Sequence, residues 1–143
     1  MDERHYTILV VDDNPDLLEL VREGLSIYFT VILARDGIEG LEMVSQTRPD
    51  CVIIDVKMPG LDGWQLVHAL RGDPTTMDIP LIVLTAMPED MGRAPSLFSG
   101  ADRYLTKPTL PSELIQAIYE ELAASRGDRE RRLRALADEG ELR

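Results

Sequence analysis

The sequence predicts an α/β fold in which a parallel sheet is covered by helices on both faces. Short apolar segments alternate about five times with segments whose large aliphatic residues recur every three or four positions. The apolar segments show little alternation between apolar and polar residues, which is typical of strands buried on both faces. Strand–helix alternation with short connections indicates a doubly wound sheet in three layers, α/β/α.

Five segments are expected to form the strands of this sheet. Four are clear apolar runs, and the second along the chain is weaker. They are Tyr6–Val11, Thr30–Leu33, Cys51–Ile54, Ile79–Leu84 and Arg103–Leu105. A helix is expected after each of them.

The helices are predicted from their first residues and from the spacing of their apolar residues. In the first helix, Asn14 is the expected N-cap and Pro15 the first helical residue. Aliphatic residues three or four apart then mark the buried face of each helix. These residues are Leu17, Val21 and Leu25; Ile38, Leu41 and Val44; Leu66 and Leu70, after Asp62; and Leu114, Ile118 and Leu122, after Pro111.

The expected fourth helix, between Pro88 and Gly100, departs from this pattern. It carries Gly92 and Pro95 in what should be its interior. A proline there costs ~3 kcal/mol, because it removes a hydrogen bond and clashes with the preceding turn. This segment is therefore expected to be short, kinked or partly unwound.

Composition excludes several classes of function. The 143 residues suffice for one domain with a sizeable core, and 26 acidic against 15 basic residues give a net charge of −11. No direct contact with nucleic acid is expected, because that needs clustered Lys and Arg. No apolar run approaches the ~20 residues that span a membrane, and no signal peptide is recognisable. A single cysteine, Cys51, suits a reducing cytoplasm, where we expect the protein to be.

The composition changes after Ala124. Residues 1–124 are expected to form the domain, and residues 125–143 a charged C-terminal extension. That extension could be helical or frayed.

Polar residues gather where the predicted strands end. Asp12 and Asp13 end the first strand, Asp55 ends the third, Thr85 ends the fourth, and Lys107 follows the fifth. In an open parallel sheet, ligands bind beyond these carboxyl ends. Three carboxylates in one place repel one another unless a cation offsets their charge, and Mg²⁺ prefers oxygen ligands. The sequence therefore predicts a Mg²⁺ site at this edge.

The same residues have the chemistry that phosphoryl transfer needs. The transfer requires neutralisation of charge on three phosphoryl oxygens, which a metal ion, the Lys107 ammonium and the Thr85 hydroxyl could share. One carboxylate remains to attack phosphorus, and Asp55 is the candidate.

Four stretches of the sequence resemble one known family. They are Ile8–Asp13, Val52–Gly60, Leu84–Ala86 and Gly100–Pro108. In this order, each at the end of a strand, they closely resemble the receiver domain of response regulators in bacterial two-component signalling, over about residues 6–122. The resemblance implies a flavodoxin-like sheet with strand order 2-1-3-4-5.

The resemblance also implies which residues hold the phosphoryl group and the metal. Asp55 is similar to the phosphoacceptor, which takes its phosphoryl group from a histidine kinase or a phosphotransfer protein. Asp13, Asp55 and the carbonyl of Lys57 are similar to direct metal ligands, and Asp12 to a ligand that acts through water. Lys107 resembles the charge partner of the phosphoryl group.

A conformational switch follows from the resemblance as well. Thr85 and Tyr104 are similar to the pair that rearranges on phosphorylation, although an aromatic residue near a strand end is often only part of the core. The Lys107–Pro108 peptide bond is expected to be cis, as in the family. The output surface is expected on the fourth helix, the fifth strand and the fifth helix, where a homodimer or another partner would bind.

The function predicted is a phosphorylation-controlled switch rather than an enzyme with turnover. A nucleotide-hydrolysing enzyme would need a phosphate-binding loop such as G-x-x-x-x-G-K-[ST], which the sequence lacks. A flavodoxin-type electron carrier would bind flavin at the same edge and would be coloured. A degenerate receiver that acts only as a scaffold should have lost an acidic residue or Lys107. A stand-alone receiver and one cut from a longer regulator or hybrid kinase both remain open.

Overall fold

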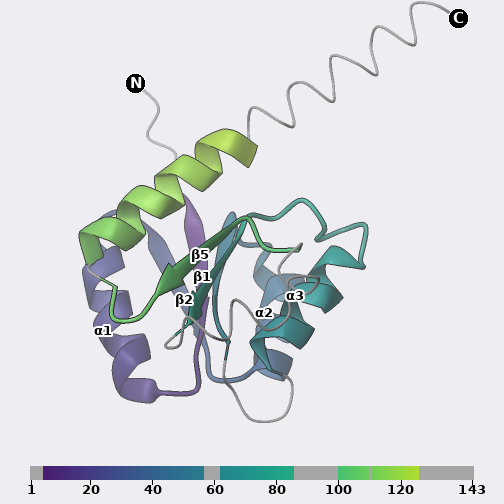
Figure 1. Cartoon of the computed structure of the whole chain (residues 1–143), viewed down its shortest axis with the longest axis horizontal. Coiled ribbons are helices and arrows are strands. Elements are labelled where there is room, and N and C mark those ends of the chain that lie inside the picture. The colour runs from purple at the N-terminus through teal and green to yellow at the C-terminus, as the bar shows by residue number, and fades with distance from the viewer. Residues whose placement is uncertain (1–4, 57–61, 86–99, 110, 126–143) are drawn as a thin grey trace, which may run out of the picture.

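The described part of the chain folds into five strands, with helices between the first four of them (Figure 1). The computed structural model describes residues 5–56, 62–85, 100–109 and 111–125. The strands are β1 (Thr7–Val11), β2 (Thr30–Ala34), β3 (Cys51–Asp55), β4 (Leu81–Thr85) and β5 (Arg103–Thr106). The helices are α1 (Pro15–Leu25), α2 (Gly37–Thr47) and α3 (Gly63–Arg71), and residues 111–125 form a further helix. Each predicted strand is confirmed to within two residues at either end.

The five strands form one parallel sheet in the order β2-β1-β3-β4-β5. This confirms the flavodoxin-like order 2-1-3-4-5. The described part of the chain contains four helices rather than the five predicted, because most of the expected fourth helix, before Gly100, falls outside it.

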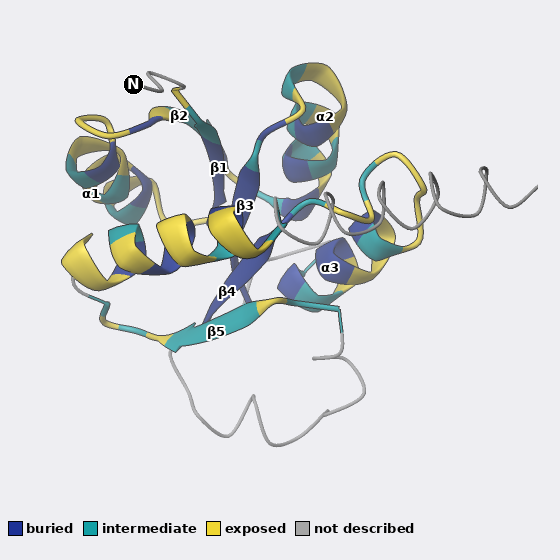
Figure 2. Cartoon of the chain, turned by 90° about the horizontal axis from the view of Figure 1, so that it is seen from above, coloured by how far each residue is buried: buried dark blue, intermediate teal, exposed yellow. Residues whose placement is uncertain are grey.

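Two separate apolar layers cover the two faces of the sheet. Along β1, Ile8 and Val10 face one layer while Leu9 and Val11 face the other, and all four are almost fully buried. Helix α1 and helix 111–125 cover the first face, and α2 and α3 cover the second (Figure 2). Side chains alternate between the faces of a strand, so burial on both faces explains the nearly continuous apolar runs in the sequence.

The helix starts are fixed by side-chain caps at the carboxyl ends of the strands. Asn14 accepts hydrogen bonds from the backbone N–H groups of Asp16 and Leu17, and Pro15 is the first helical residue, as predicted. Asp62 and Gln65 form a reciprocal capping box at the start of α3. Both helices therefore begin beside the edge of the sheet where the polar residues lie.

The last element that the structure describes is the helix at residues 111–125. Residues 126–143 lie outside the described residues, so the boundary predicted near residue 124 and the form of the extension stay predictions. Among the described helices, none is long and apolar enough to cross a membrane.

Candidate functional site

The strand order brings the predicted polar residues to one edge of the sheet. β3 lies between β1 and β4, and β5 lies beside β4. Asp55 and Thr85 are the last residues of their strands, Asp12 follows β1 directly, and Lys107 follows β5 directly. Because the strands are parallel, these ends meet at the carboxyl edge, as the sequence predicts.

Three carboxylates form the centre of this edge. Asp12, Asp13 and Asp55 each offer an oxygen, and the three oxygens lie within 4.8 Å of one another. Asp12 is 3% exposed and Asp55 is 7% exposed, whereas Asp13 is open to solvent. The N–H of Asn14 donates to Asp12 Oδ1 at 2.9 Å, so the first turn of α1 holds this carboxylate in place.

Lys107 joins the two buried carboxylates. Its Nζ donates to Asp55 Oδ1 at 2.9 Å and to Asp12 Oδ2 at 3.1 Å. Its backbone N–H donates to the Thr85 carbonyl at 2.7 Å, which continues the β4–β5 pairing past the end of the sheet. The Lys107–Pro108 bond is cis, which confirms the prediction.

Burial and crowding set the proton affinities at this edge. Burial raises the pKa of Asp55; the hydrogen bond from Lys107 offsets this only in part, and the charge of Asp12 adds to the rise. Burial alone would lower the pKa of Lys107, but its hydrogen bonds to Asp55 and Asp12 outweigh that effect and raise it. The three carboxylates therefore carry more negative charge than the one lysine ammonium offsets, and a further cation would relieve this imbalance.

Thr85 and Tyr104 share one face of the sheet. Tyr104 pairs with Val83 across β4 and β5, and Thr85 lies two residues beyond Val83 on the same strand. Thr85 is fully buried, while Tyr104 is half-buried at the edge of the layer formed with α2 and α3. The structure thus places the two predicted switch residues on a common face, near the carboxylates.

Two contacts at this edge are additional to the sequence-based prediction. A Cβ at Gly63 would lie 2.2 Å from the Asp55 carbonyl oxygen, so only glycine fits at the start of α3. The next residue, Trp64, has its ring 6.2 Å from that of Tyr104, centroid to centroid. A glycine directly after a helix cap was the available signal for the close approach.

Some of the predicted residues lie outside the described part of the chain. Lys57, whose carbonyl is a predicted metal ligand, is among them, as is the expected fourth helix from Pro88 to residue 99. Their predicted roles are therefore untested.

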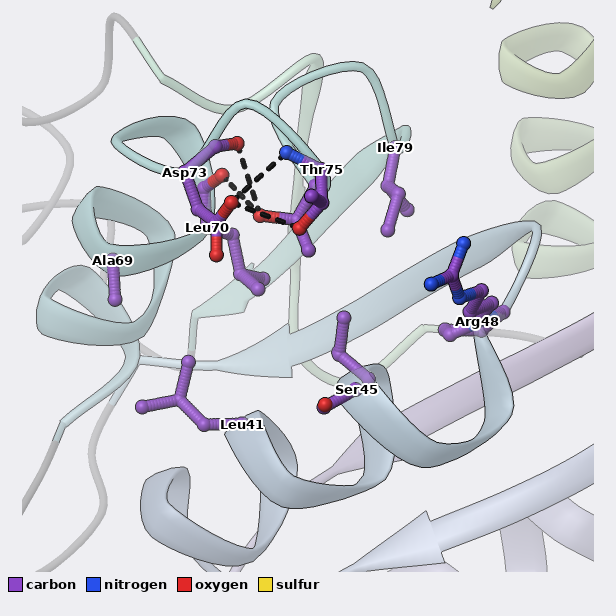
Figure 3. Close-up of a pocket in the computed structure, with 11 residues that line it drawn as sticks. Leu41, Ser45, Arg48, Ala69, Leu70, Asp73, Thr75 and Ile79 are labelled. Atoms are coloured by element: carbon purple, nitrogen blue, oxygen red, sulfur yellow. Dashed lines mark hydrogen bonds between the residues drawn. The ribbon is translucent and has the colours of Figure 1, made fainter.

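A cavity of about 210 Å³ lies at the opposite edge of the sheet, between α2 and α3 (Figure 3). Its lining includes Pro49, just before β3, and Ile79, just before β4, so it is at the amino ends of the strands. Asp73, at its rim, accepts hydrogen bonds from the N–H and hydroxyl of Thr75. This polar group is satisfied within its own turn, and the cavity is distinct from the carboxylate site.

The comparison with protein families decides the identity of the fold. Residues 8–119 match the response regulator receiver domain. The chain belongs to this family. It is a receiver domain, the phosphoacceptor module of two-component signalling, and its acidic edge corresponds in position to the ligand-binding edge of the fold.

Solved structures similar to this chain include two receiver domains. The receiver domain of a signal transduction histidine kinase from Syntrophus aciditrophicus is 34% identical, with a TM-score of 0.76 and coverage of 83% of this chain and 91% of that one. The receiver domain of the Francisella response regulator 1452 is 30% identical, with a TM-score of 0.76 and coverage of 85% and 99%.

A curated relative matches over a shorter stretch. The phosphate regulon transcriptional regulatory protein PhoB of Escherichia coli K12 is 49% identical over 43 residues, which is 30% of this chain. The match spans 19% of the length of PhoB, about a fifth. This likeness therefore concerns part of the receiver domain only.

Proposed function

We propose that Asp55 accepts a phosphoryl group from a histidine kinase or a phosphotransfer protein. The observation that carries this proposal is the Lys107 ammonium, which lies between Asp55 and Asp12 at hydrogen-bond distance from both. An ammonium at this place can pair with a phosphoryl oxygen as soon as the phosphoryl group reaches Asp55. Asp55 is also buried. It ends β3, the central strand of the sheet, beside Asp12 and Lys107.

The transfer itself is a displacement at phosphorus. One carboxylate oxygen of Asp55 forms a bond to phosphorus while the bond from phosphorus to an imidazole nitrogen of the donor breaks. The electron pair returns to that nitrogen, and a proton from water completes the neutral imidazole. Lys107 stabilises the charge on the phosphoryl oxygens, and the Thr85 hydroxyl, at the end of the adjacent strand, is the proposed donor to another.

The carboxylate cluster fits Mg²⁺ by its donor chemistry. It offers only hard oxygen ligands, with Asp13 on the open side and the other two acids buried. We assign Asp13, Asp55 and the Lys57 carbonyl as direct ligands and Asp12 as a ligand through water. When bound, the ion would offset the charge on the phosphoryl oxygens.

Phosphorylation then changes the conformation rather than starting a catalytic cycle. We propose that Thr85 moves toward the phosphoryl oxygens and that Tyr104 moves inward in response. The output surface includes β5 and helix 111–125, which Arg103 ties together through ion pairs of 2.8 Å with Glu120 and Glu121. A homodimer through this face and the expected fourth helix, a cytoplasmic location and the lack of direct nucleic-acid binding are parts of this proposal.

The test is the intact mass of the protein after incubation with acetyl phosphate and Mg²⁺. We expect wild type and Asp16→Asn, an exposed acid in α1, to gain the mass of one phosphoryl group. Asp55→Asn should gain none, and chelation of the metal should slow the reaction of wild type and of Asp16→Asn. If Asp55→Asn is phosphorylated at the wild-type rate, Asp55 is not the acceptor. A coloured protein with the absorbance of flavin would instead favour an electron carrier.

A further inference from the structure

The start of α3 is joined directly to the backbone of the proposed phosphoacceptor. Gly63 donates its N–H to the Val56 carbonyl at 3.0 Å, and its Cα lies so close to Asp55 that a Cβ would overlap the Asp55 carbonyl oxygen. The capping box between Asp62 and Gln65 fixes the direction in which the helix leaves this contact. A shift of the Asp55 backbone must therefore move the first turn of α3.

Trp64 extends this contact to Tyr104. The two rings have centroids 6.2 Å apart and planes at 49°, which is within the range of favourable tilted aromatic pairs. Both side chains are half-buried and pack at the margin of the apolar layer under α2 and α3. The indole thus lies beside the ring of a tyrosine that is only half-buried.

Tyr104 is connected to Asp55 from its other side as well. It lies in β5, three residues before Lys107, which directly follows the strand and donates to Asp55. Burial, with a smaller effect from the charge of Asp102, raises the pKa of Tyr104, so the ring partner of Trp64 is the neutral phenol. Changes at Asp55 can therefore reach the Trp64–Tyr104 pair through β5 and through α3.

We propose that Trp64 is a positioning residue for the switch: its indole holds Tyr104 in the resting position and links that position to the Asp55 backbone through Gly63. This inference rests on the proposed function, because it needs Asp55 to be the phosphorylated residue. The inward movement of Tyr104 is proposed to take its ring away from the indole and so to end the contact seen in this structure. The contact therefore favours the unphosphorylated state, and its loss should shift the equilibrium toward the active state.

The fluorescence of Trp64 reports on this contact directly, because the chain contains a single tryptophan. The full chain would be treated with Mg²⁺ and beryllofluoride, or with Mg²⁺ and acetyl phosphate, and indole emission followed in each case. The acetyl phosphate sample would also be weighed by mass spectrometry. We expect a change in emission that Mg²⁺ alone does not produce, and none with beryllofluoride in Asp55→Asn.

The variant Tyr104→Leu separates a specific contact from general movement. It should still gain one phosphoryl group on Asp55 but lose the change in emission, whereas Tyr104→Phe should keep most of it. An unchanged emission in phosphorylated wild type overturns the inference while leaving the proposed function intact. So does the full wild-type change in phosphorylated Tyr104→Leu. Absence of phosphorylation in wild type instead rejects the proposed function.

The size of the bias is measured by the apparent affinity for beryllofluoride at fixed Mg²⁺. Trp64→Leu removes the aromatic contact but keeps an apolar side chain, and we expect roughly 2- to 10-fold tighter binding. Trp64→Phe retains a ring and should stay within about 2-fold of wild type. Equal affinities of wild type and Trp64→Leu would show that Trp64 only packs. Far-UV circular dichroism checks that each variant is folded. If Trp64→Leu does not fold, the emission of the Tyr104 variants tests the inference in its place.

Discussion

The two edges of the sheet use charged side chains in opposite ways. At the carboxyl edge, three carboxylates lie together, and one ammonium, that of Lys107, pairs with the two that are buried. At the amino edge, the Arg71 guanidinium of α3 meets one carboxylate, that of Asp102, together with three backbone carbonyls. The charged groups at the carboxyl edge have surplus negative charge. At the amino edge, the donors of the Arg71 side chain have partners within the protein, without any ligand.

This difference separates binding from stability. A buried acid with too few cations destabilises the folded state until a ligand supplies positive charge, so we expect the carboxyl edge to gain stability when Mg²⁺ is added. The amino edge gains nothing from an added ion, because its donors and acceptors already satisfy one another. Substitutions at the two edges should therefore respond differently to metal.

The largest effect is expected from Arg71→Ala. The Arg71 side chain donates to the carbonyls of Met77, Ile79 and Gly100 and to the carboxylate of Asp102, so it holds the end of α3, the loop before β4 and the start of β5. Its loss should lower the free energy of unfolding by ~2–4 kcal/mol. Urea unfolding measures this, and the rise in stability on adding Mg²⁺ should match that of wild type.

The control for this variant is Arg22→Ala. Arg22 pairs with Glu19 on the exposed surface of α1, and such pairs contribute about 0–1 kcal/mol. If Arg71→Ala costs no more than Arg22→Ala, the hydrogen bonds of Arg71 do not stabilise the fold, and the contrast between the edges is lost.

The sequence was sufficient to predict the strands and the gathering of polar residues at one edge of the sheet, because both depend on local patterns. Asp12 and Lys107 directly follow a strand and Asp55 ends one, and a parallel sheet places such positions at one edge whatever the details of packing. The caps at Asn14 and Asp62 are equally local, since a cap depends on residues within the first turn.

The missed contacts join residues that are far apart in the chain. Arg71 at the end of α3 could be interpreted only as a cation near a helix C-terminus, yet its carboxylate partner is 31 residues away. The contact of Trp64 with Tyr104 likewise depends on how α3 lies against β5. Residue type and spacing do not indicate such contacts. The close approach of Gly63 to Asp55 is different, because the glycine itself is a weak signal in the sequence.

An intermediate effect is expected from Asp13→Ala. In metal-free buffer the variant should be more stable than wild type by ~0.5–1 kcal/mol, because one of three crowded carboxylates is removed. With Mg²⁺ it should gain much less stability than wild type, because a ligand is lost. Thermal melts with and without Mg²⁺ measure both changes.

Asp16→Ala is the matched control, three residues along the chain. Asp16 lies in the first turn of α1, where its negative charge is favourable, so its loss should lower stability slightly in either buffer. An Mg²⁺-induced rise in melting temperature that is as large in Asp13→Ala as in Asp16→Ala would contradict the assignment of Asp13 as a ligand.

A change in stability as small as that of Asp13→Ala in metal-free buffer, but independent of metal, is expected at the amino edge, where Arg48, the C-cap of α2, has a left-handed conformation with φ of 48°. This conformation is costly for a residue with a Cβ and free of that cost for glycine. Arg48→Gly should therefore raise the free energy of unfolding by ~0.5–1 kcal/mol, since the relief of strain exceeds the added freedom of the unfolded chain. Arg48→Ala removes the same exposed side chain without relieving the backbone, so it should show no such gain.

Both variants should be phosphorylated at the wild-type rate, because Arg48 precedes β3 while Asp55 ends it. Equal stabilities of the glycine and alanine variants would mean that the backbone at Arg48 is not strained, and altered phosphorylation in either would mean that the two edges are coupled.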